Sequence, residues 1–526
     1  MTLNSTGLAI GSALPSANLQ VSGNALVTHS LAVGGSSLSS SNLNVNGSMG
    51  MSVGNISTNT LIPEHSFILA NTASGNLTVY LPSANICAGR LVTIKKASTS
   101  YDLTIMPMLK NTIDGNVSLG LKSLSDTLPY ASLMSSGSNW HILGVTSSAV
   151  KTVLPGFTST WKTDNAGTSA SDQITLPLNG TQNFTVYWGD GSSNTITSSS
   201  DAAKTHTYSS AGVYQVRIVG SQVRFYFNNT GDKLKILDIS QWDTVYRFSD
   251  RDFYGCANLT ISATDIPDIS GTISFRYTFT SCSNLKSLPF MPFWDVSKIT
   301  NFYRTFMGCS QFNENLSSWV VSSATDMTDM FNGCTSFNQD ISSWNVSNVT
   351  TMIGLFSGCT SFNQDISSWN ASNVTSMGTM FKDCSIFNRN ISTWNVSKVT
   401  AMNEIFNGCI QFNQDLSSWD VSSVTTFYRA FLGCSAFKQN LSAWNLTSLN
   451  PANTTDFFKN VDLNNPDSTS STANYDALLV SWAGKTLPSG LSINFGTSKY
   501  SAAGNVGRVI LTGTKGWTIT DGGFKP

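Results

Sequence analysis

A period of 25 residues runs through the middle of this chain. Cysteine recurs with that spacing, at Cys309, Cys334, Cys359, Cys384, Cys409 and Cys434. Tryptophan keeps the same spacing, at Trp319, Trp344, Trp369, Trp394 and Trp419. In such chains each repeat is one structural unit, and it buries its apolar face by stacking against its neighbours. The period therefore predicts a solenoid whose coils carry Trp and Cys at equivalent positions.

One half of each repeat has the apolar spacing of a short helix. Met352, Leu355 and Phe356 are spaced i, i+3 and i+4, which places three apolar side chains on one helix face. Thr350 precedes them as an N-cap, and Gly358 follows as a left-handed helix end. The pattern predicts one short helix in every coil.

The other half of each repeat is predicted to be a strand. Ile341, Trp344 and Val346 fit the L-x-x-L-x-L pattern of leucine-rich repeats. Two interpretations of the tryptophans compete, a buried core column and an exposed platform for sugars. The core is favoured, because Trp takes a leucine position in every unit. The residues between them then line an outward polar face that includes Ser343, Asn345, Asn370, Asn395 and Asp420.

Cysteine and histidine usage argues against disulfides, zinc and cofactors. An evenly spaced cysteine series differs from the disulfide framework of a small secreted domain, and it suits buried free thiols. Zinc needs clustered ligands, usually with histidine. The histidines lie outside the repeats, at His29, His65, His141 and His206. We therefore expect neither a metal site nor a cofactor.

Composition narrows the classes of partner. Charged residues make up 11% of the chain and the net charge is −1, against roughly 25% charged residues in typical soluble proteins. Nucleic-acid binding needs a basic surface, and none is expected here. No run of apolar residues is long enough for a membrane-spanning helix. The first residues also lack the basic and apolar regions of a secretory signal.

The N-terminal part is expected to be β-rich. Residues 1–60 are rich in Ser, Asn and Gly with Leu/Val alternation, which fits either a disordered linker or an intertwined fibrous β segment. The fibrous alternative is preferred, and such a segment needs partner chains, so we expect a homo-oligomer and guess a trimer. Residues 61–150 contain short β-branched runs, which predict a small antiparallel β domain.

Residues 151–222 resemble a PKD-type β-sandwich, an immunoglobulin-like module of surface proteins. The resemblance lies in the motif from Trp188 to Ser192, in His206-Thr-Tyr208, and in Ala-Gly-Val-Tyr ending at Tyr214. Two roles are open for Asp190, a turn hydrogen bond or a calcium ligand. The turn is favoured, because calcium takes six or more oxygens.

The repeats, taken as residues 223–450, resemble the BspA-like surface proteins, relatives of the leucine-rich-repeat family. FNQDISSWNVSNVT followed by Met-x-x-Met-Phe-x-Gly-Cys carries that resemblance, and residues 451–526 are similar to the family's C-terminal cap. The family occurs in bacterial adhesins and in large viruses, so the resemblance implies surface display and binding without a reaction. The fold class expected is a mainly β multidomain protein ending in a leucine-rich-repeat-like α/β solenoid.

Function is expected to be attachment rather than catalysis. Glycan hydrolysis needs paired carboxylates in a cleft, whereas the acids of the repeats look like turn residues. The first hypothesis is a virion surface or fibre protein of a phage or large DNA virus that binds a host glycan or protein. Its N-terminal region would contact other virion proteins. A bacterial cell-surface adhesin and a purely structural capsid cement or spike protein are the alternatives.

Two surfaces compete as the ligand site. On the predicted helical half, Tyr303-Arg304 and Tyr428-Arg429 interrupt otherwise small residues. Tyr and Arg are favoured at interface hot spots. The rival is the polar Ser/Asn/Asp face of the predicted strand half.

Overall fold

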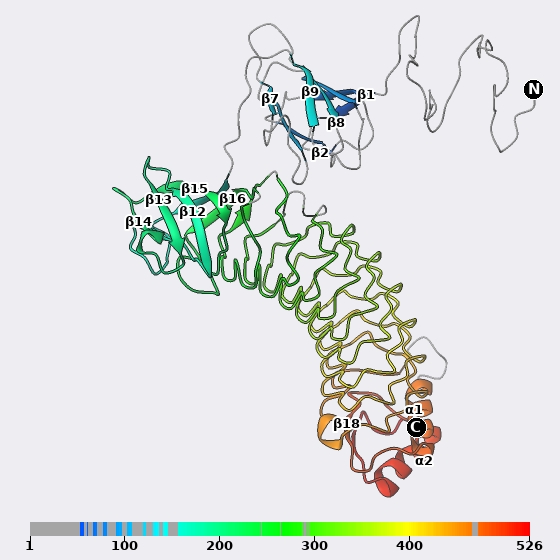
Figure 1. Ribbon diagram of the computed structural model, residues 1–526. Coiled ribbons are helices and arrows are strands. Elements are labelled where there is room, and N and C mark those ends of the chain that lie inside the picture. The colour runs from blue at the N-terminus through cyan, green and yellow to red at the C-terminus, as the bar shows by residue number, and fades with distance from the viewer. Residues whose placement is uncertain are drawn as a thin grey trace, which may run out of the picture. The chain divides into compact units, whose positions relative to one another are not determined.

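The computed structural model describes the strands between residues 53 and 145, residues 156–464 except 244, 264, 287, 289, 290, 292 and 293, and residues 472–526 (Figure 1). This part of the chain is mainly strand, turn and bend. The fibrous segment expected at residues 1–60 lies almost wholly outside the described residues. Of that segment the structure describes β1 (Val53–Ile56) and the first residue of β2 (Thr60–Leu61).

The first β region forms two sheets, in the orders β1-β3-β5-β8-β9 and β2-β4-β6-β7. Its other strands are β3 (Phe67–Ala70), β4 (Leu77–Leu81), β5 (Leu91–Lys96), β6 (Leu103–Pro107), β7 (Leu119–Leu121), β8 (Tyr130–Ser135) and β9 (Trp140–Val145). The pairs β2–β4, β3–β5 and β4–β6 are parallel, whereas β5–β8, β6–β7 and β8–β9 are antiparallel. The prediction of an antiparallel domain is therefore wrong for the first strands. Up to β6 the chain alternates between the two sheets instead of forming hairpins, so each returning strand runs in the same direction as its partner.

The second β region contains the PKD-like motifs. Its main sheet has the order β13-β12-β15-β10-β16-β17, and β11 pairs with β14 in a small second sheet. The strands are β10 (Phe157–Lys162), β11 (Gln173–Thr175), β12 (Thr181–Tyr187), β13 (Ser193–Ser198), β14 (Thr205–Thr207), β15 (Val213–Gln222), β16 (Ile236–Gln241) and β17 (Thr260–Ile261). Val216 and Ile218 of β15 are buried, whereas Val213 and Gln215 are exposed, as strand alternation predicts.

The main sheet continues across the expected boundary between residues 222 and 223. Strand β10 pairs with β15 on one side and with β16 on the other. Aromatic packing crosses the same point, because the Phe157 ring lies 5.3 Å from Phe225 and 4.8 Å from Tyr246. The second β region and the repeats consequently share one continuous hydrophobic core.

The repeats stack as 25-residue coils (Figure 1). Single-residue parallel bridges join each coil to the next, and they involve Ser274, Asn301, Asp326, Thr351, Ser376, Ala401 and Thr426. Around each bridge, alternate backbone N–H groups donate to the next coil. Met352 N donates to Ser376 O at 3.0 Å, and Gly354 N donates to Gly378 O at 2.9 Å. This bridge column holds the coils in register.

The predicted helix in each coil does not form. Residues 353–358 adopt successive turns, and the bridge residue Thr351 precedes them. An α-helix would bond every N–H four residues back within the segment, but here alternate N–H groups bond the next coil and the others bond three residues back. Thr350 is not an N-cap, since its Oγ1 donates to Thr325 O of the preceding coil at 3.1 Å. Met352, Leu355 and Phe356 are nevertheless buried, as predicted.

The predicted strand half is also wrong. The segment from Ile341 to Val346 consists of turns and irregular backbone, so it forms no outward sheet face. Its side chains still point as expected, because Trp344 is 3% exposed and belongs to the core. The Trp344 indole stacks on Trp319 and Trp369, with ring centroids 6.5 and 6.4 Å away. The core interpretation of the tryptophan column is confirmed.

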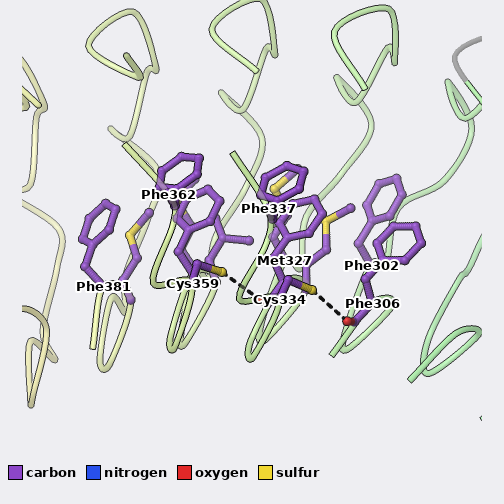
Figure 2. Close-up of a cluster of buried hydrophobic side chains, with 14 of the residues drawn as sticks. Phe302, Phe306, Met327, Cys334, Phe337, Cys359, Phe362 and Phe381 are labelled. Atoms are coloured by element: carbon purple, nitrogen blue, oxygen red, sulfur yellow. Dashed lines mark hydrogen bonds between the residues drawn. The ribbon is translucent and has the colours of Figure 1, made fainter. Parts of the chain in front are cut away.

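The cysteine column lies in the same core, between Phe and Met side chains (Figure 2). All the repeat cysteines are free and buried, which confirms the thiol prediction for these positions. From Cys282 onward, each Sγ lies within hydrogen-bonding distance of a carbonyl of the preceding coil. Cys334 Sγ is 3.0 Å from Phe306 O, and Cys359 Sγ is 3.0 Å from Phe331 O. These two carbonyls also accept from the backbone N–H of Cys309 and Cys334, so the thiol is a second donor to each.

Side-chain donors in the coils point back toward the preceding coil. Trp344 Nε1 donates to Leu316 O at 2.9 Å, Ser343 Oγ to Ser317 O at 2.7 Å, and Asn348 Nδ2 to Ser322 O at 2.8 Å. Trp294 lacks this bond, and its buried Nε1 has no hydrogen-bond partner. These Trp, Ser and Asn donors therefore depend on the preceding coil for their acceptors.

Residues after the last coil close the stack. This C-terminal cap contains α1 (Ala473–Gly484), β18 (Ser492–Asn494), α2 (Ala502–Val509) and β19 (Thr518–Thr520), and β18 pairs with β19 in parallel. Ser481 Oγ of α1 donates to Ser442 O at 2.8 Å, and Asn474 Nδ2 donates to Lys438 O at 2.7 Å. These donors take the place of a further coil. Neither helix in the described part of the chain has the length and apolar character to cross a membrane.

Candidate functional site

Two columns of left-handed backbone run along the coils, and the first is mostly glycine. Its members lie two residues after a buried Phe of each coil: Ser281, Gly308, Gly333, Gly358, Asp383, Gly408, Gly433 and Asn460. Their φ angles lie between 58° and 76°. Glycine adopts this conformation without the penalty that a Cβ brings. The first column thus favours the residue that the backbone geometry favours, and Ser281, Asp383 and Asn460 are the exceptions.

The second column, called here the display column, is filled differently. Its members are Tyr277, Arg304, Asp329, Gly354, Thr379, Glu404, Arg429 and Asp456, with φ between 51° and 61°. A left-handed conformation costs a non-glycine residue on the order of 1–2 kcal/mol. Glycine would remove this strain, yet it occupies one position of the column. The side chains are therefore retained in spite of their backbone cost.

The residue that precedes each member of the display column also differs from coil to coil. These residues are Arg276, Tyr303, Thr328, Ile353, Gly378, Asn403, Tyr428 and Thr455. The two columns together form what we call the display face, beside the bridge column. Elsewhere in the coil the Trp, Phe and Cys columns are buried. The display face thus varies from coil to coil, although Asp329, Gly354 and Gly378 on it are buried.

Tyr303 and Arg304 form a compact unit on this face. The Arg304 guanidinium lies 5.0 Å from the centre of the Tyr303 ring, within cation–π range. Its Nε donates to Asp329 Oδ2 of the next coil at 3.0 Å. Burial and a hydrogen bond with Tyr277 raise the pKa of Tyr303 above its usual value. The phenol therefore stays protonated and uncharged near neutral pH.

Tyr428 and Arg429 repeat that arrangement. The Arg429 guanidinium lies 4.9 Å from the centre of the Tyr428 ring. Arg429 Nε is 3.5 Å from Asp456 Oδ2, which is close enough for an ion pair. The Nε atom itself is buried and has no hydrogen-bond acceptor. The second unit thus has the same chemistry as the first, with a less directed contact to its carboxylate.

The first unit extends toward the β regions through more Tyr and Arg side chains. Tyr277 lies 5.2 Å from Tyr303, and Tyr254 stacks on Tyr277 at 5.5 Å. The Arg251 guanidinium lies 5.1 Å from the Tyr277 ring, and that of Arg276 lies 5.6 Å from the Tyr303 ring. The sequence pairs Arg276-Tyr277 and Tyr303-Arg304 thus form one patch, and Tyr254 and Arg251 are members that the repeat pattern did not indicate.

The middle of the display face has small side chains. Gly354 and Gly378 are both buried, and a Cβ at Gly354 would lie 2.1 Å from Asp329 Oδ1. Ile353, beside Gly354, is 38% exposed. Lys382 and Glu404 form an ion pair at the far end of this strip. Burial opposes ionisation of Glu404, but Lys382 outweighs it and lowers the pKa of that carboxyl.

The rival polar face uses its oxygen atoms in its own turns. Asn345 Oδ1 accepts from Ser347 N, and Asn370 Oδ1 accepts from Ser372 N, each at 3.1 Å. The equivalent acceptors are Asn395 Oδ1 and Asp420 Oδ1, and Ser343 Oγ instead donates to the preceding coil. Hydrogen bonds from Ser422 lower the pKa of Asp420. These residues are exposed, and in each Asn and Asp one side-chain oxygen already accepts a turn hydrogen bond.

A further column of Asn and Asp residues confirms the expectation that the acids of the repeats are turn residues. In each member the side-chain oxygen accepts from the N–H two residues later, as from Ser342 N to Asp340 Oδ1 at 2.9 Å. The same bond occurs at Asn315, Asp365, Asn390, Asp415 and Asn440. Asn and Asp exchange freely here because both offer that oxygen.

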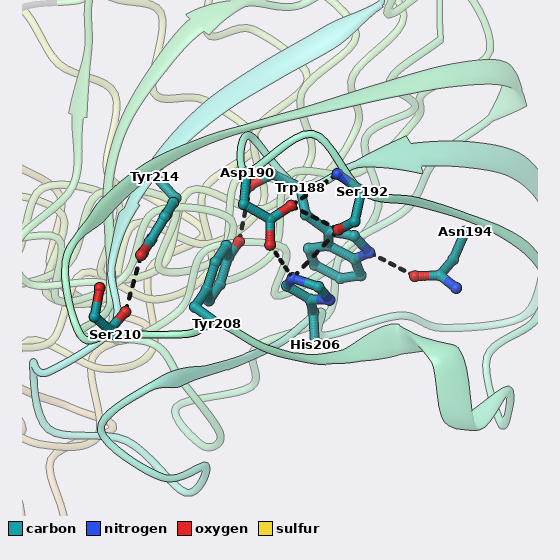
Figure 3. A network of polar contacts seen from close by, with 8 residues as sticks. All are labelled: Trp188, Asp190, Ser192, Asn194, His206, Tyr208, Ser210 and Tyr214. Carbon is teal, nitrogen blue, oxygen red and sulfur yellow. Dashed lines mark hydrogen bonds and ion pairs between the residues drawn. The ribbon is translucent and has the colours of Figure 1, made fainter.

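A polar network in the second β region brings a Ser, a His and an Asp together (Figure 3). His206 Nε2 lies 2.7 Å from Asp190 Oδ2 and 3.4 Å from Ser192 Oγ. A catalytic triad uses the two imidazole nitrogens separately, one for each partner. Here both contacts involve Nε2, and Ser192 Oγ lies 2.6 Å from Asp190 Oδ1. The geometry therefore does not provide a serine nucleophile with a base.

The same network fixes the turn after β12. Asp190 Oδ1 accepts from Ser192 N at 2.9 Å, which confirms the predicted turn bond. Trp188 stacks on His206 with centroids 4.8 Å apart, and Tyr208 donates to Trp188 O at 3.0 Å. Burial opposes ionisation of Asp190, but hydrogen bonds from Ser192 and His206 outweigh it and lower its pKa to about 2.

The cysteine column offers neither a nucleophile nor a metal site. Burial raises the pKa of the Cys309 thiol to about 12, and it raises those of Cys334 and Cys359 well above the usual value. The thiolate form, which is the reactive and metal-binding one, is thus suppressed. Among the described residues, no group of three or more His, Cys, Asp and Glu side chains could hold a metal ion.

Comparisons with known proteins bear on the repeats alone. A search of curated proteins found no match. One family model matches the chain over residues 273–386 and again over residues 356–471. The two matched segments overlap and together cover most of the coils and the first part of the cap. In these coils the protein is similar to the family described as "Mycoplasma protein of unknown function, DUF285".

Proposed function

We propose that this protein is a non-enzymatic recognition protein whose stacked coils present the display face to a ligand on a host surface. The observation that carries the proposal is the contrast between the two left-handed columns. The first column is glycine in five of its eight positions, whereas the second has one glycine and otherwise keeps Tyr, Arg, Asp, Thr and Glu at a backbone cost. These side chains would be retained because their contacts with a ligand offset the free-energy cost of the left-handed backbone.

The other repeat positions support this assignment because they already have structural roles. Trp, Phe and Cys fill the core, and the two Asx columns bond their own turns. Two polar residues with aromatic neighbours, Arg304 and Arg429, stand on the display face. Tyr and Arg are the residue types that dominate interface hot spots.

We further propose two fold assignments. The stacked coils are a solenoid of the leucine-rich-repeat type, with turns where most relatives carry a helix. The 25-residue period and the bridge column support this assignment. The second β region is a PKD-like sandwich, supported by the Trp188–Ser192 turn and by the pairing of β11 with β14.

The site of display that we propose is the surface of a virion, with a bacterial cell surface as the alternative. The fibre-like composition of residues 1–60 supports assembly into a homo-oligomer, with a trimer as the specific guess. That segment would contact other virion or surface proteins. A purely structural cement or spike role is the second alternative, and it requires no ligand on the display face.

The test is cell adhesion of the full-length chain carrying a fluorescent label, measured on protist, algal and bacterial cells. We expect a variant combining Tyr303→Ala, Arg304→Gly, Tyr428→Ala and Arg429→Gly to lose at least tenfold in adhesion. The Arg→Gly changes relieve left-handed strain, so this variant should remain folded. The matched control combines Asn345→Ala, Asn370→Ala and Asn395→Ala on the rival face.

The control variant should adhere like the unmodified chain. Loss of adhesion in the control alone would move the site to the rival face. Adhesion that neither variant changes would overturn the proposal and favour the structural cement role.

A further inference from the structure

We infer that the C-terminal cap docks on the surface of an anionic lipid membrane through helix α2, whose apolar side chains face outward. The inference goes beyond the proposed function, because it concerns a surface that the display face does not include. It is drawn from the sidedness of α2, from its fixed orientation against α1, and from the positive charge around the two helices.

Helix α2 buries its glycines and exposes its larger apolar side chains. Its buried residues are Gly504 and Gly507. Val506 and Val509 are 64% and 58% exposed, and Ile510, which directly follows the helix, is 37% exposed. These three positions are spaced i, i+3 and i+4, so they lie on one face. The surface helices of soluble proteins turn such an apolar face toward the core, whereas α2 turns it outward.

The orientation of α2 is fixed by close contacts on its glycine side. Helices α1 and α2 lie side by side at the end of the coil stack (Figure 1). A Cβ at Gly507 would lie 2.5 Å from Leu479 O, and one at Gly504 would lie 2.1 Å from Asp476 Oδ1. Asp476 also accepts from the N-cap of α2, from Ser501 N at 2.9 Å and from Ser501 Oγ at 2.6 Å. The valine face therefore cannot rotate inward without breaking these contacts.

Neither cap helix adds an unpaired charge to this surface. Asp476, the charged residue of α1, is buried against α2, and Arg508, that of α2, pairs with Asp521 at 2.8 Å. Val480 of α1 is 49% exposed, and its N would lie 2.6 Å from a Cβ at Gly507, so it borders α2. The end of a repeat stack needs a polar outer face where it meets water. An exposed apolar surface at this end instead marks an interaction site.

The charge around the helices selects an anionic partner surface. Residues 477–526 contain five Lys and Arg and one Asp, so their net charge is +4 (5 − 1), against −5 for the rest of the chain (−1 − 4). Lys499 is exposed two residues before the N-cap Ser501, and Lys525 is exposed with its N donating to Tyr500 O at 2.7 Å. Lysines around an apolar helix face suit anionic lipid headgroups. Two copies of this cap would bring like charges together, which disfavours a second copy as the partner.

The membrane contact that follows from this arrangement is shallow. The Val and Ile side chains enter the boundary between headgroups and acyl chains, while Lys499 and Lys525 contact the anionic headgroups. The contacts between α1 and α2 stay unchanged, because they lie on the glycine side of α2. The coils remain outside the lipid, so this docking differs from insertion across a membrane.

The first experiment is cosedimentation of the full-length chain with vesicles of phosphatidylcholine, with and without phosphatidylserine. We expect about fivefold more binding to vesicles that contain about 30% phosphatidylserine, because the anionic lipid adds attraction for lysine to the apolar contact. High salt should reduce this difference, since it screens charges at the membrane surface.

The second experiment changes the outward face. Val506→Gln combined with Val509→Gln should lose about fivefold in binding to phosphatidylserine vesicles, because the inserted face becomes polar. The matched control combines Val213→Gln and Val320→Gln, since these valines are 58% and 56% exposed in β15 and in a coil. The control should bind like the unmodified chain. All four side chains are exposed, and cooperative thermal unfolding shows that each variant is folded.

The third experiment changes the charge. Lys499→Gln combined with Lys525→Gln should remove most of the preference for phosphatidylserine and leave the weaker binding to phosphatidylcholine unchanged. A preference that this variant keeps in full would contradict the role given to the two lysines.

The inference is overturned if neither kind of vesicle binds the chain, if both bind it equally, or if the valine variant binds like the unmodified chain. Dimerisation without vesicles that the valine variant abolishes would assign the face to a second copy instead. The Tyr/Arg variant of the adhesion test should sediment with vesicles like the unmodified chain, so the two proposals fail separately.

Discussion

At the residue scale, Asp190 shows how one side chain can hold a turn that glycines allow. Gly189 and Gly191 on either side have φ of 89° and 93°, so the turn is open to few other residues. Asp190 accepts from Ser192 and contacts His206, and its neighbours Trp188 and Tyr208 complete the network. The charge on this carboxylate contributes to the stability of the second β region.

Asp190→Asn should lower stability by about 1 kcal/mol at pH 6, allowing for solvent screening of a partly exposed group. The pKa of Asp190 is about 2 in the folded chain, below its ordinary 3.8. Its contribution is therefore present above pH 4 and lost as pH falls from about 4 to about 2. Urea unfolding of both proteins at pH 6 and pH 2.5 checks this, and the difference should be clearly smaller at the lower pH.

The matched control is Asp164→Asn, whose carboxylate forms an exposed ion pair with Lys162 at 3.5 Å. That change should cost at most a few tenths of a kcal/mol at pH 6. A pH-independent loss in Asp190→Asn would show that the lost oxygen beside His206, rather than the charge, is what matters, since Asn keeps an oxygen for the turn hydrogen bond.

Residue types predicted core and turn roles well, because apolar burial and Asx hydrogen bonds depend on the side chain alone. Trp344, Cys359 and Asp340 lie where the repeat pattern places them. The sequence predicted two members of the display column as ligand-site residues, Arg304 and Arg429. The left-handed backbone of this column could not be predicted, since Arg and Glu do not indicate positive φ. What the sequence does show is that two adjacent positions vary between repeats whose other positions are mostly repeated.

At the element scale, the coil replaces a helix and a strand by turns that use the same apolar spacing. Positions i, i+3 and i+4 face one side of a helix, and they also face one side of two successive turns. Met352, Leu355 and Phe356 therefore gave no information on which of the two would form. The bonds to the next coil decide between them, and a single repeat does not reveal those bonds.

Trp344→Phe should destabilise the stack by about 1 kcal/mol more than Trp294→Phe. Both changes remove the same side-chain volume from the tryptophan column. Trp344 also loses its bond to Leu316 O, whereas Trp294 Nε1 has no partner to lose. Chemical unfolding followed by far-UV circular dichroism measures both. Equal losses would mean that stacking alone accounts for the tryptophan column.

At the scale of the whole molecule, the last coil relies on the cap for the donors that a further coil would supply. Lys485 Nζ donates to Ser442 O at 2.6 Å and to Trp444 O at 2.8 Å, beside the bond from Ser481. Burial lowers the pKa of this lysine. The resemblance to a family cap predicted that the stack would be closed here, but not which atoms would close it.

Lys485→Met should weaken the end of the stack by about 1–2 kcal/mol, because two part-buried carbonyls lose a charged donor. Hydrogen exchange should accelerate in residues 409–450 and remain unchanged in residues 309–358. Lys398→Met is the control, since Lys398 contacts an exposed Asn373 at 2.8 Å. Uniform acceleration along all coils would show that the stack unfolds as a single unit.

The backward direction of the side-chain donors has a consequence for synthesis on the ribosome. A nascent coil emerges after the coil that holds its acceptors, so Trp344 and Cys359 find Leu316 O and Phe331 O already in place. Because the N-terminal parts of a chain are made first, each new coil can dock on a finished template. Stacking through these side-chain bonds can thus follow translation, and the cap, made after the coils, supplies donors to the final coil.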